Sequence, residues 1–273
     1  MGTLYLVSTP IGNLEDITLR ALRILGEVDI IAAEDTRHTR KLLKRYEITT
    51  KLTSYHEHNK EAREEFLLDA LEEGDLALVS DAGTPGLSDP GFELVRAVLE
   101  RGHEVTSIPG PSAPIAALVA SGLPTDSFIF LGYLPRKTSA RRAFIKSLAH
   151  EPRTLIFFEV PHRIQKVLGD LVAILGKDRP AAVGRELTKL HEETIRGTLG
   201  EVQSHIASGD PRGEYTLVLG GAPSPGKWTK PEVMKAMRAR IDTGLSRSAA
   251  ARQIAAESGW DRQDVYRLSL EER

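Results

Sequence analysis

The chain of 273 residues contains no cysteine. This absence excludes disulfides, thiolate nucleophiles and cysteine-ligated metal sites, and it fits a reducing compartment. No run reaches the ~18 apolar residues that a membrane-spanning helix needs. The segment Met1 to Val7 has no basic residues, and it predicts a first strand in place of a signal peptide. We therefore expect a cytoplasmic protein without a membrane partner.

Several common ligand motifs are also missing. Neither G-x-G-x-x-G nor G-x-x-x-x-G-K-[ST] occurs, which argues against a dinucleotide-binding site and a P-loop. The zinc motif His-Glu-x-x-His is also absent. His56 and His58 would share one side of a strand, so a metal pair is conceivable. Because no third ligand is evident nearby, we expect no metal site and prefer a surface or substrate-contacting role for these histidines.

Charge of one sign is not in excess, because the formal net charge is −2. Three segments are nevertheless locally basic: 36–46, 136–146 and 227–252. Each could be a solvated helix face. Three of them on a chain of this net charge make binding of a polyanion more plausible than composition alone suggests.

The residues present alternate between short apolar runs and amphipathic helical patterns. Strands are predicted at 4–8, 29–33, 51–55, 76–80 and 104–108, with helices beginning at Thr18, Thr36, Asn59, Phe92 and Ser112. Strands that alternate with helices predict parallel pairing in an α/β sheet. Residues 124–136 indicate a junction. Beyond it, strands at 154–159, 181–185, 192–198 and 215–219 and helices at 140–148, 164–175 and 201–207 predict a second, α+β part.

The end of the chain has a different pattern. Gly220 to Gly226 has the Gly/Pro/Ser composition of a linker. Helices are predicted at 231–241, 246–257 and 262–268, and Gly259 and Trp260 would form the turn of a helix-turn-helix. Two interpretations stay open: an RNA-contacting module, or a small helical cap. The predicted domains are 1–123, 124–221 and 222–273.

Three loops follow predicted strand ends, where ligands bind in open α/β sheets. They are Ser8–Asp16, Ser80–Gly91 and Pro109–Ala113. Each combines glycine, which permits close backbone approach, with proline, which stiffens the chain. Single loops of this kind are ordinary turns, but three in succession predict a pocket for a small cofactor read by main-chain hydrogen bonds.

The segment Glu34–His38 joins carboxylates and a cation at another strand end. It could be a general-base site, or a helix N-cap whose charges suit the helix dipole. The sequence alone favours neither.

Taken together, these stretches resemble a known family. They are Ser-Thr-Pro-Ile-Gly-Asn-Leu-Glu-Asp-Ile-Thr-Leu-Arg-Ala (8–21), Ala-Ala-Glu-Asp-Thr-Arg-His-Thr (32–39), Val-Ser-Asp-Ala-Gly-Thr-Pro (79–85), Pro-Gly-Pro-Ser-Ala (109–113), Arg-Thr-Leu-Ile-Phe-Phe-Glu (153–159), Arg-Glu-Leu-Thr-Lys (185–189) and Gly-Glu-Tyr-Thr-Leu-Val (213–218). Over residues 3 to 221 the chain is similar to the ribosomal RNA small subunit methyltransferase I family, in the tetrapyrrole-methylase superfamily.

The resemblance implies a fold and a cofactor. It implies two α/β lobes of the tetrapyrrole-methylase type with the cofactor cleft between them, plus a small C-terminal helical domain. The cofactor would be S-adenosylmethionine. By resemblance its site is lined by Pro10, Asp81, Ala82, Gly83, Thr84, Ser112, Ala113, Phe157 or Phe158, Ala182, Arg185 and Thr216. A homodimer follows by analogy.

The implied reaction is methylation of the ribose 2′-hydroxyl of a cytidine in 16S rRNA, acting on RNA within the small ribosomal subunit. Such a hydroxyl needs a base or a cation that stabilises the forming alkoxide. Asp35 is the first candidate base and His56 the second, with Arg37 and Lys137 as candidate cations. Arg40, Lys41, Arg136, Arg141 and Arg142 are candidate phosphate contacts.

Two other functions remain possible at this level. A small-molecule methylase acting on a tetrapyrrole would need a pocket wide enough for a macrocycle. Porphyrin and corrin methylases carry a Gly-x-Gly-x-Gly-Asp loop where this chain has Ser8 to Asn13, which weakens that reading. A DNA-binding regulator would use the tail helices for duplex binding and the α/β part as a sensor.

Overall fold

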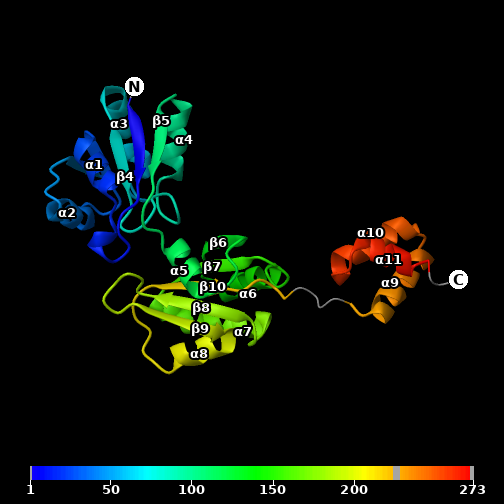
Figure 1. The fold of residues 1–273 in the computed structure, drawn as a ribbon. Coiled ribbons are helices and arrows are strands. Elements are labelled where there is room, and N and C mark those ends of the chain that lie inside the picture. The colour runs from blue at the N-terminus through cyan, green and yellow to red at the C-terminus, as the bar shows by residue number, and fades with distance from the viewer. Residues whose placement is uncertain (1, 224–227, 271–273) are drawn as a thin grey trace. The chain divides into compact units, whose positions relative to one another are not determined.

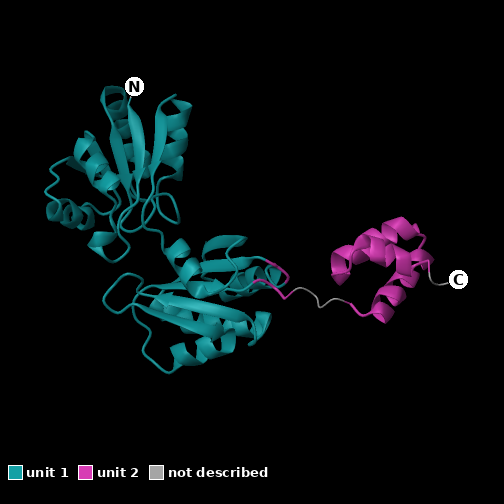
Figure 2. Ribbon diagram, viewed as in Figure 1, with its two compact units in different colours: residues 1–149, 153–220 teal, residues 150–152, 221–273 magenta. Residues whose placement is uncertain are grey.

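The computed structural model describes residues 2–223 and 228–270. The chain divides into two compact units, residues 1–149 with 153–220 and residues 150–152 with 221–273 (Figure 2). Residues 224–226 of the predicted linker and Lys227 of the third basic segment lie outside the described residues. Within the part that is described, no helix is both long and apolar enough to span a membrane.

The first unit begins with a five-stranded parallel sheet (Figure 1). Its order is β3-β2-β4-β1-β5, formed by β1 (Thr3–Val7), β2 (Ile30–Ala33), β3 (Lys51–Ser54), β4 (Leu76–Val79) and β5 (Glu104–Ile108). All five strands were predicted, and their parallel pairing confirms the interpretation of the alternating pattern.

Helices cover both faces of this sheet, because alternate strand residues point to opposite sides. Ile31 and Ala33 pack on one face with the helices α1 (Leu19–Glu27) and α2 (Thr36–Arg45). Ile30 and Ala32 pack on the other with α3 (Lys60–Glu73) and α4 (Phe92–Glu100). A short 3-10 turn, η1 (Leu14–Asp16), precedes α1. Strands buried on both faces read as continuous apolar runs, as β2 and β4 do.

A second five-stranded sheet follows in the same unit. Its order is β6-β7-β10-β8-β9, with β6 (Phe128–Tyr133), β7 (Thr154–Glu159), β8 (Pro180–Arg185), β9 (Glu193–Thr198) and β10 (Tyr215–Leu219). Only β6 and β7 are parallel; the other pairs are antiparallel. The sequence did not predict β6, a partly buried edge strand with an irregular register near Phe130 and Tyr133.

The two faces of the second sheet are covered unequally. Helix α5 (Ala113–Ser121) follows β5 in the chain but packs on this sheet, where Ala117 and Leu118 meet Ile156 and Val218. The opposite face carries α6 (Thr138–Ser147), α7 (Pro161–Leu175) and α8 (Leu199–Ala207). The loop before α5 therefore runs from one sheet to the other.

The second unit has a core of its own. It contains α9 (Lys230–Asp242), α10 (Arg247–Ser258) and α11 (Arg262–Leu268), which bury Val233, Ile254 and Val265 together. Gly259, with a φ of 66°, ends α10 in the left-handed region, and Trp260 follows in the turn to α11. The predicted turn at Gly259 and Trp260 is confirmed.

Candidate functional site

The three strand-end loops of the first sheet meet. Since β1 lies between β4 and β5, the loops that follow these strands are neighbours. The N–H groups of Thr9 and Gly83 each donate to the other residue's carbonyl, at 2.9 and 3.0 Å, and the hydroxyls of Ser8 and Thr84 lie 3.2 Å apart. A Cβ on Gly110 would lie 2.9 Å from Cβ of Ser8. Glycine is thus required where the third loop passes the first.

A pocket opens where these loops meet the ends of the second sheet. The first sheet and its loops supply Ile11, Glu34, Asp81, Ala82, Gly83, Thr84, Leu87, Ser88, Asp89, Ser112, Ala113 and Pro114. The second sheet and its loops supply Tyr133, Phe158, Glu159, Leu187, Glu214, Tyr215 and Thr216. Tyr133 and Phe158 lie with ring centroids 5.6 Å apart, and they form an apolar part of the wall.

The polar side of this pocket is acidic. Its described lining includes five carboxylates, Glu34, Asp81, Asp89, Glu159 and Glu214, and no Arg, Lys or His. Burial, together with the neighbouring Glu34 charge, raises the pKa of Asp89 to about 6. Burial likewise raises the pKa of Glu34 and of Glu159. A concave site with perturbed carboxylates is the usual form of a ligand or catalytic site.

The ends of β2 and β4 hold two of these carboxylates in place. The N–H of Asp81 donates to Oε2 of Glu34 at 3.3 Å, and the N–H of Asp35 donates to Oδ1 of Asp81 at 3.0 Å. Each carboxylate is fixed by the other strand's backbone. This reciprocal arrangement explains how like charges can stay together at the pocket wall.

Most of the residues predicted to bind a cofactor lie in this lining. Asp81, Ala82, Gly83, Thr84, Ser112, Ala113 and Thr216 line the pocket. Pro10 is buried beside it, whereas its neighbour Ile11 is in the lining. Arg185 forms an ion pair with Glu193 at 3.5 Å and donates to the carbonyl of Arg212, and it does not line the pocket.

Phe157 and Ala182 take other positions. Phe157 is 1% exposed and belongs to the helix-covered core, while Phe158 lines the pocket. The choice between them follows from strand alternation, because Ile156 and Phe158 share the face opposite to Phe157. Ala182 is also buried, in the core beneath α5. Phe158 is therefore the residue of the two that can contact a ligand.

Asp35 is the N-cap of α2. Its carboxylate accepts from the N–H and the side chain of Arg37, with Oδ2 2.7 Å from Nη2, and these bonds hold the pKa of Asp35 far below its usual range. Of the two interpretations of Glu34–His38, the helix cap describes Asp35. Asp35 and Arg37 do not line the pocket, whereas Glu34, one residue earlier, does. Proximity in sequence to the strand end was the signal for Asp35, and the residue of this segment that lines the pocket is its neighbour Glu34.

The remaining catalytic candidates lie outside the lining as well. The N–H of His56 donates to Oδ1 of Asn59 at 2.8 Å, and its ring lies 6.1 Å from that of His58. Lys137 is exposed at the start of α6. Across residues 2–223 and 228–270, no group of three or more His, Asp or Glu side chains is placed to hold a metal ion.

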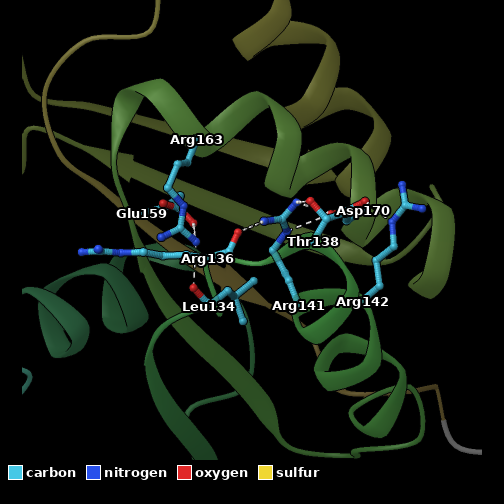
Figure 3. A network of polar contacts seen from close by, with 8 residues as sticks. All are labelled: Leu134, Arg136, Thr138, Arg141, Arg142, Glu159, Arg163 and Asp170. Carbon is cyan, nitrogen blue, oxygen red and sulfur yellow. Dashed lines mark hydrogen bonds and ion pairs between the residues drawn. The ribbon is translucent and has the colours of Figure 1, made fainter.

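The predicted RNA contacts fall into two sets. Arg40, Lys41 and Arg136 are exposed. Arg141 is only 5% exposed, and its Nη2 lies 2.6 Å from Oδ2 of Asp170 (Figure 3). Arg142 reaches the other oxygen of the same carboxylate at 2.6 Å, but its side chain is 59% exposed, so it stays a candidate phosphate contact. The expectation that Arg141 contacts phosphate is wrong, because its guanidinium is buried against a carboxylate.

Comparison with known proteins defines the class first. The family described as Tetrapyrrole (Corrin/Porphyrin) Methylases matches residues 3–203. The uroporphyrin-III C-methyltransferase of Thermus thermophilus, solved in complex with S-adenosyl homocysteine, has the same fold. Its TM-score is 0.56 at 22% identity, over 80% of this chain and 97% of that one. The two sheets of this chain thus have the fold of a tetrapyrrole methylase.

Closer relatives give the particular family. A ribosomal RNA small subunit methyltransferase I from Synechocystis is 50% identical over 99% of this chain and 98% of its own length. Another, from Halalkalibacterium halodurans, is 46% identical over 99% of this chain and 96% of its own. The chain belongs to the ribosomal RNA small subunit methyltransferase I family, within the tetrapyrrole methylases, which confirms the resemblance found in the sequence.

Proposed function

We propose that this protein transfers a methyl group from S-adenosylmethionine to the ribose 2′-hydroxyl of a cytidine in 16S rRNA. The observation that carries the proposal is the pocket formed by the three strand-end loops in a chain whose relatives, at 46–50% identity, are named ribosomal RNA small subunit methyltransferase I. The acceptor would be RNA in the small ribosomal subunit, in the cytoplasm, and the enzyme would act as a homodimer.

The chemistry of the pocket fits this cofactor. S-adenosylmethionine carries a sulfonium and an ammonium. Among the five carboxylates of the lining, Glu159 and Glu214 pair with Arg163 and Lys189, and the other three, Glu34, Asp81 and Asp89, favour a cationic ligand over a nucleotide with a phosphate chain. The hydroxyls of Thr84, Ser112 and Thr216 and the backbone beside Gly83 supply neutral hydrogen-bond partners. When bound, the cofactor supplies an electrophilic methyl group and its own leaving group, so the protein has to bind, orient and handle a proton.

Positioning is the main task of the protein in such a displacement. Tyr133 and Phe158 would exclude water on one side, and the fixed loops would hold the ligand on the other. The 2′-hydroxyl loses its proton as the bond forms. Asp89 is the proposed acceptor of that proton, because it lines the pocket. With a pKa of about 6, Asp89 is a stronger base than an ordinary aspartate, and it is still ionised at neutral pH.

Because the pocket is acidic and would repel phosphates, the phosphates of the RNA must bind to residues outside the pocket. The exposed cations Arg37, Arg40, Lys41, Arg136 and Lys137 are the proposed contacts. A ribose hydroxyl reaches the pocket more easily from a single-stranded or splayed nucleotide than from a helix.

The test is transfer of a labelled methyl group to unmodified 16S rRNA and, separately, to small ribosomal subunits, with the product mapped. Label on a cytidine 2′-oxygen is the expected result, and the better acceptor of the two shows whether subunit assembly is needed. Label on neither, with S-adenosyl homocysteine still bound in calorimetry, contradicts the proposal. Methylation of a tetrapyrrole in its place would favour the small-molecule alternative.

A further inference from the structure

Arginine side chains from two helices bind backbone carbonyls of the segment Leu134–Lys137, which lies between β6 and α6 (Figure 3). Arg163, on α7, donates from Nη2 to the carbonyl of Leu134 at 2.7 Å. Arg141, on α6, donates from Nη1 to the carbonyl of Arg136 at 3.2 Å. Two guanidinium groups thus fix the segment at carbonyls two residues apart.

Both guanidinium groups are themselves held by buried carboxylates. Asp170, 4% exposed, accepts from Nε of Arg141 at 2.8 Å and also pairs with Arg142. Hydrogen bonds from Arg142 and Arg141 lower the pKa of Asp170 even though burial opposes this. Glu159, 2% exposed, lies with Oε2 3.3 Å from Nη2 of Arg163, and its other oxygen accepts from the N–H of Val160 at 2.9 Å.

Burying ion pairs is an expensive way to connect two helices and a strand. Desolvation of both charges cancels much of the attraction between them, and apolar residues of similar volume often stabilise a fold as well or better. What the arginines add is geometry, because a planar fork can bind a carboxylate and a carbonyl at once. The network therefore specifies where the segment lies.

The fixed segment carries exposed charge next to the pocket. Tyr133, which immediately precedes it, lines the pocket, and so does Glu159 of the network. Arg136 and Lys137 are exposed, and the side chain of Arg136 points away from the cluster around Asp170 (Figure 3). These two cations therefore follow a residue of the pocket wall, Tyr133, by three and four positions in the chain.

We propose that Arg141 and Arg163, held by Asp170 and Glu159, are positioning residues that fix Leu134–Lys137 so that Arg136 and Lys137 bind phosphates of the RNA acceptor beside the pocket. This inference rests on the proposed function for the identity of the polyanion. It replaces the phosphate contact predicted for Arg141 with an indirect role, in which Arg141 acts through the residues whose backbone it holds.

The test is a double-mutant cycle on RNA binding. Affinity for 16S rRNA transcribed in vitro is measured across a salt series for the wild type, Arg136→Ala, Arg141→Lys and the double variant. Lysine keeps the charge beside Asp170 but lacks the fork that reaches Asp170 and the carbonyl together. Arg136→Ala is expected to weaken binding about threefold to tenfold and to reduce the salt slope by about 1. Arg141→Lys should do nearly the same, and Arg136→Ala should then add little in the double variant.

Arg179→Lys is the matched control. Arg179 is also 5% exposed and donates to a backbone carbonyl, that of Gly220, but it lies outside the network around Asp170 and Glu159. It should lower the thermal midpoint without changing the salt slope. If Arg141→Lys does not fold, as judged by binding of S-adenosyl homocysteine, Arg163→Lys tests the bond to Leu134 in the same cycle.

Two outcomes overturn the inference. One is a positioning variant that binds RNA with the wild-type salt slope. The other is an effect of Arg136→Ala that is equally large in both backgrounds. If the wild type methylates 16S rRNA in that case, the proposed function stands and the positioning role fails. A wild-type protein that neither methylates nor binds the rRNA overturns both.

Discussion

At the scale of single residues, the pocket decides which carboxylate can accept a proton. Asp35 and Asp89 both follow strands of the first sheet, yet their environments drive their pKa values apart. Asp35 is held ionised by Arg37. Asp89 is half-buried and faced by the charges of Glu34, Asp81 and Glu214, and these raise its pKa to about 6 against the opposing effect of the hydrogen bond from Ser80. A separation of this kind distinguishes a structural acid from a proton acceptor.

The pKa of Asp89 predicts two opposite effects of Asp89→Asn. Methyl transfer should fall by about 100-fold or more, and in the wild type it should rise as the pH passes through about 6. Protonated Asp89 favours the fold, so its contribution to stability is present below the ordinary pKa of 3.8 and is lost as the pH rises to about 6. Asn carries no charge, so the variant avoids the cost of holding an ionised carboxylate at this position of the fold. The thermal midpoint should therefore rise by a few degrees at pH 8 and little at pH 4.

The measurements are single-turnover rates and thermal unfolding across this pH range. Ser88→Ala, at the neighbouring pocket residue, is the control for a local change that removes no titratable group. Wild-type turnover by Asp89→Asn at pH 8 would eliminate Asp89 as the base, and Glu34 and Asp81 would be the next carboxylates of the lining to test.

At the scale of elements, helix α2 ends in a geometry that its sequence does not favour. The N–H of Ile48 donates to the carbonyl of Leu43 at 2.9 Å and that of Glu47 to Lys44 at 3.3 Å, which is a Schellman motif. Glu47 sits in the left-handed region with a φ of 56°. Glycine is usual at this position because a Cβ is strained there.

Glu47→Gly should therefore stabilise the protein. The free energy of unfolding is expected to rise by about 0.5 kcal/mol. This gain is the backbone strain that glycine relieves, reduced by the greater conformational entropy that glycine gives the unfolded chain. Denaturant unfolding measures it. Glu73→Gly, at the last helical residue of α3, is the opposite control and should cost up to about 1 kcal/mol, the value for a helix interior. A loss of stability in both variants would show that the strain at Glu47 is negligible.

The loop after β1 meets the loop after β8 at Gly12. A Cβ there would collide with the side chain of Lys189 and would lie 2.9 Å from the carbonyl of Leu187, which lines the pocket. Gly12→Ala should displace this second loop and weaken S-adenosyl homocysteine binding by about tenfold, a loss of about 1.4 kcal/mol. Calorimetry measures it. Gly26→Ala, where a Cβ meets nothing within 4 Å, is the matched control, and equal affinities of the two variants would contradict the prediction.

At the scale of the whole molecule, the described pocket and the helical tail belong to different units. Every lining residue lies between Ile11 and Thr216, and the tail buries its own core. A chain that ends at Gly220 is therefore expected to bind S-adenosyl homocysteine within about twofold of the full-length protein, as separate domains do. Loss of binding by a truncated chain that still unfolds cooperatively would contradict this. Its affinity for 16S rRNA then separates the two interpretations of the tail, RNA module or helical cap.

Local pattern fixed much of this protein in advance. Apolar periodicity predicted the strands of the first sheet and the helices, because burial of one face imposes the period on the sequence. The loops rich in Gly and Pro could be predicted at the strand ends, and the sequence motifs within these loops identified the family. The edge strand β6 was missed because its residues are only partly buried and its register is irregular.

Only the tertiary structure decided which side chains share a site. Strand alternation and helix cover put Phe158 at the pocket and Phe157 in the core. Asp170, 29 residues along the chain, turned Arg141 from a surface cation into a buried one. The acidic pocket brings together residues from the ends of β2, β4, β7 and β10. A local sequence pattern cannot predict such a pocket, because the energy of a charge depends on neighbours that are distant in sequence.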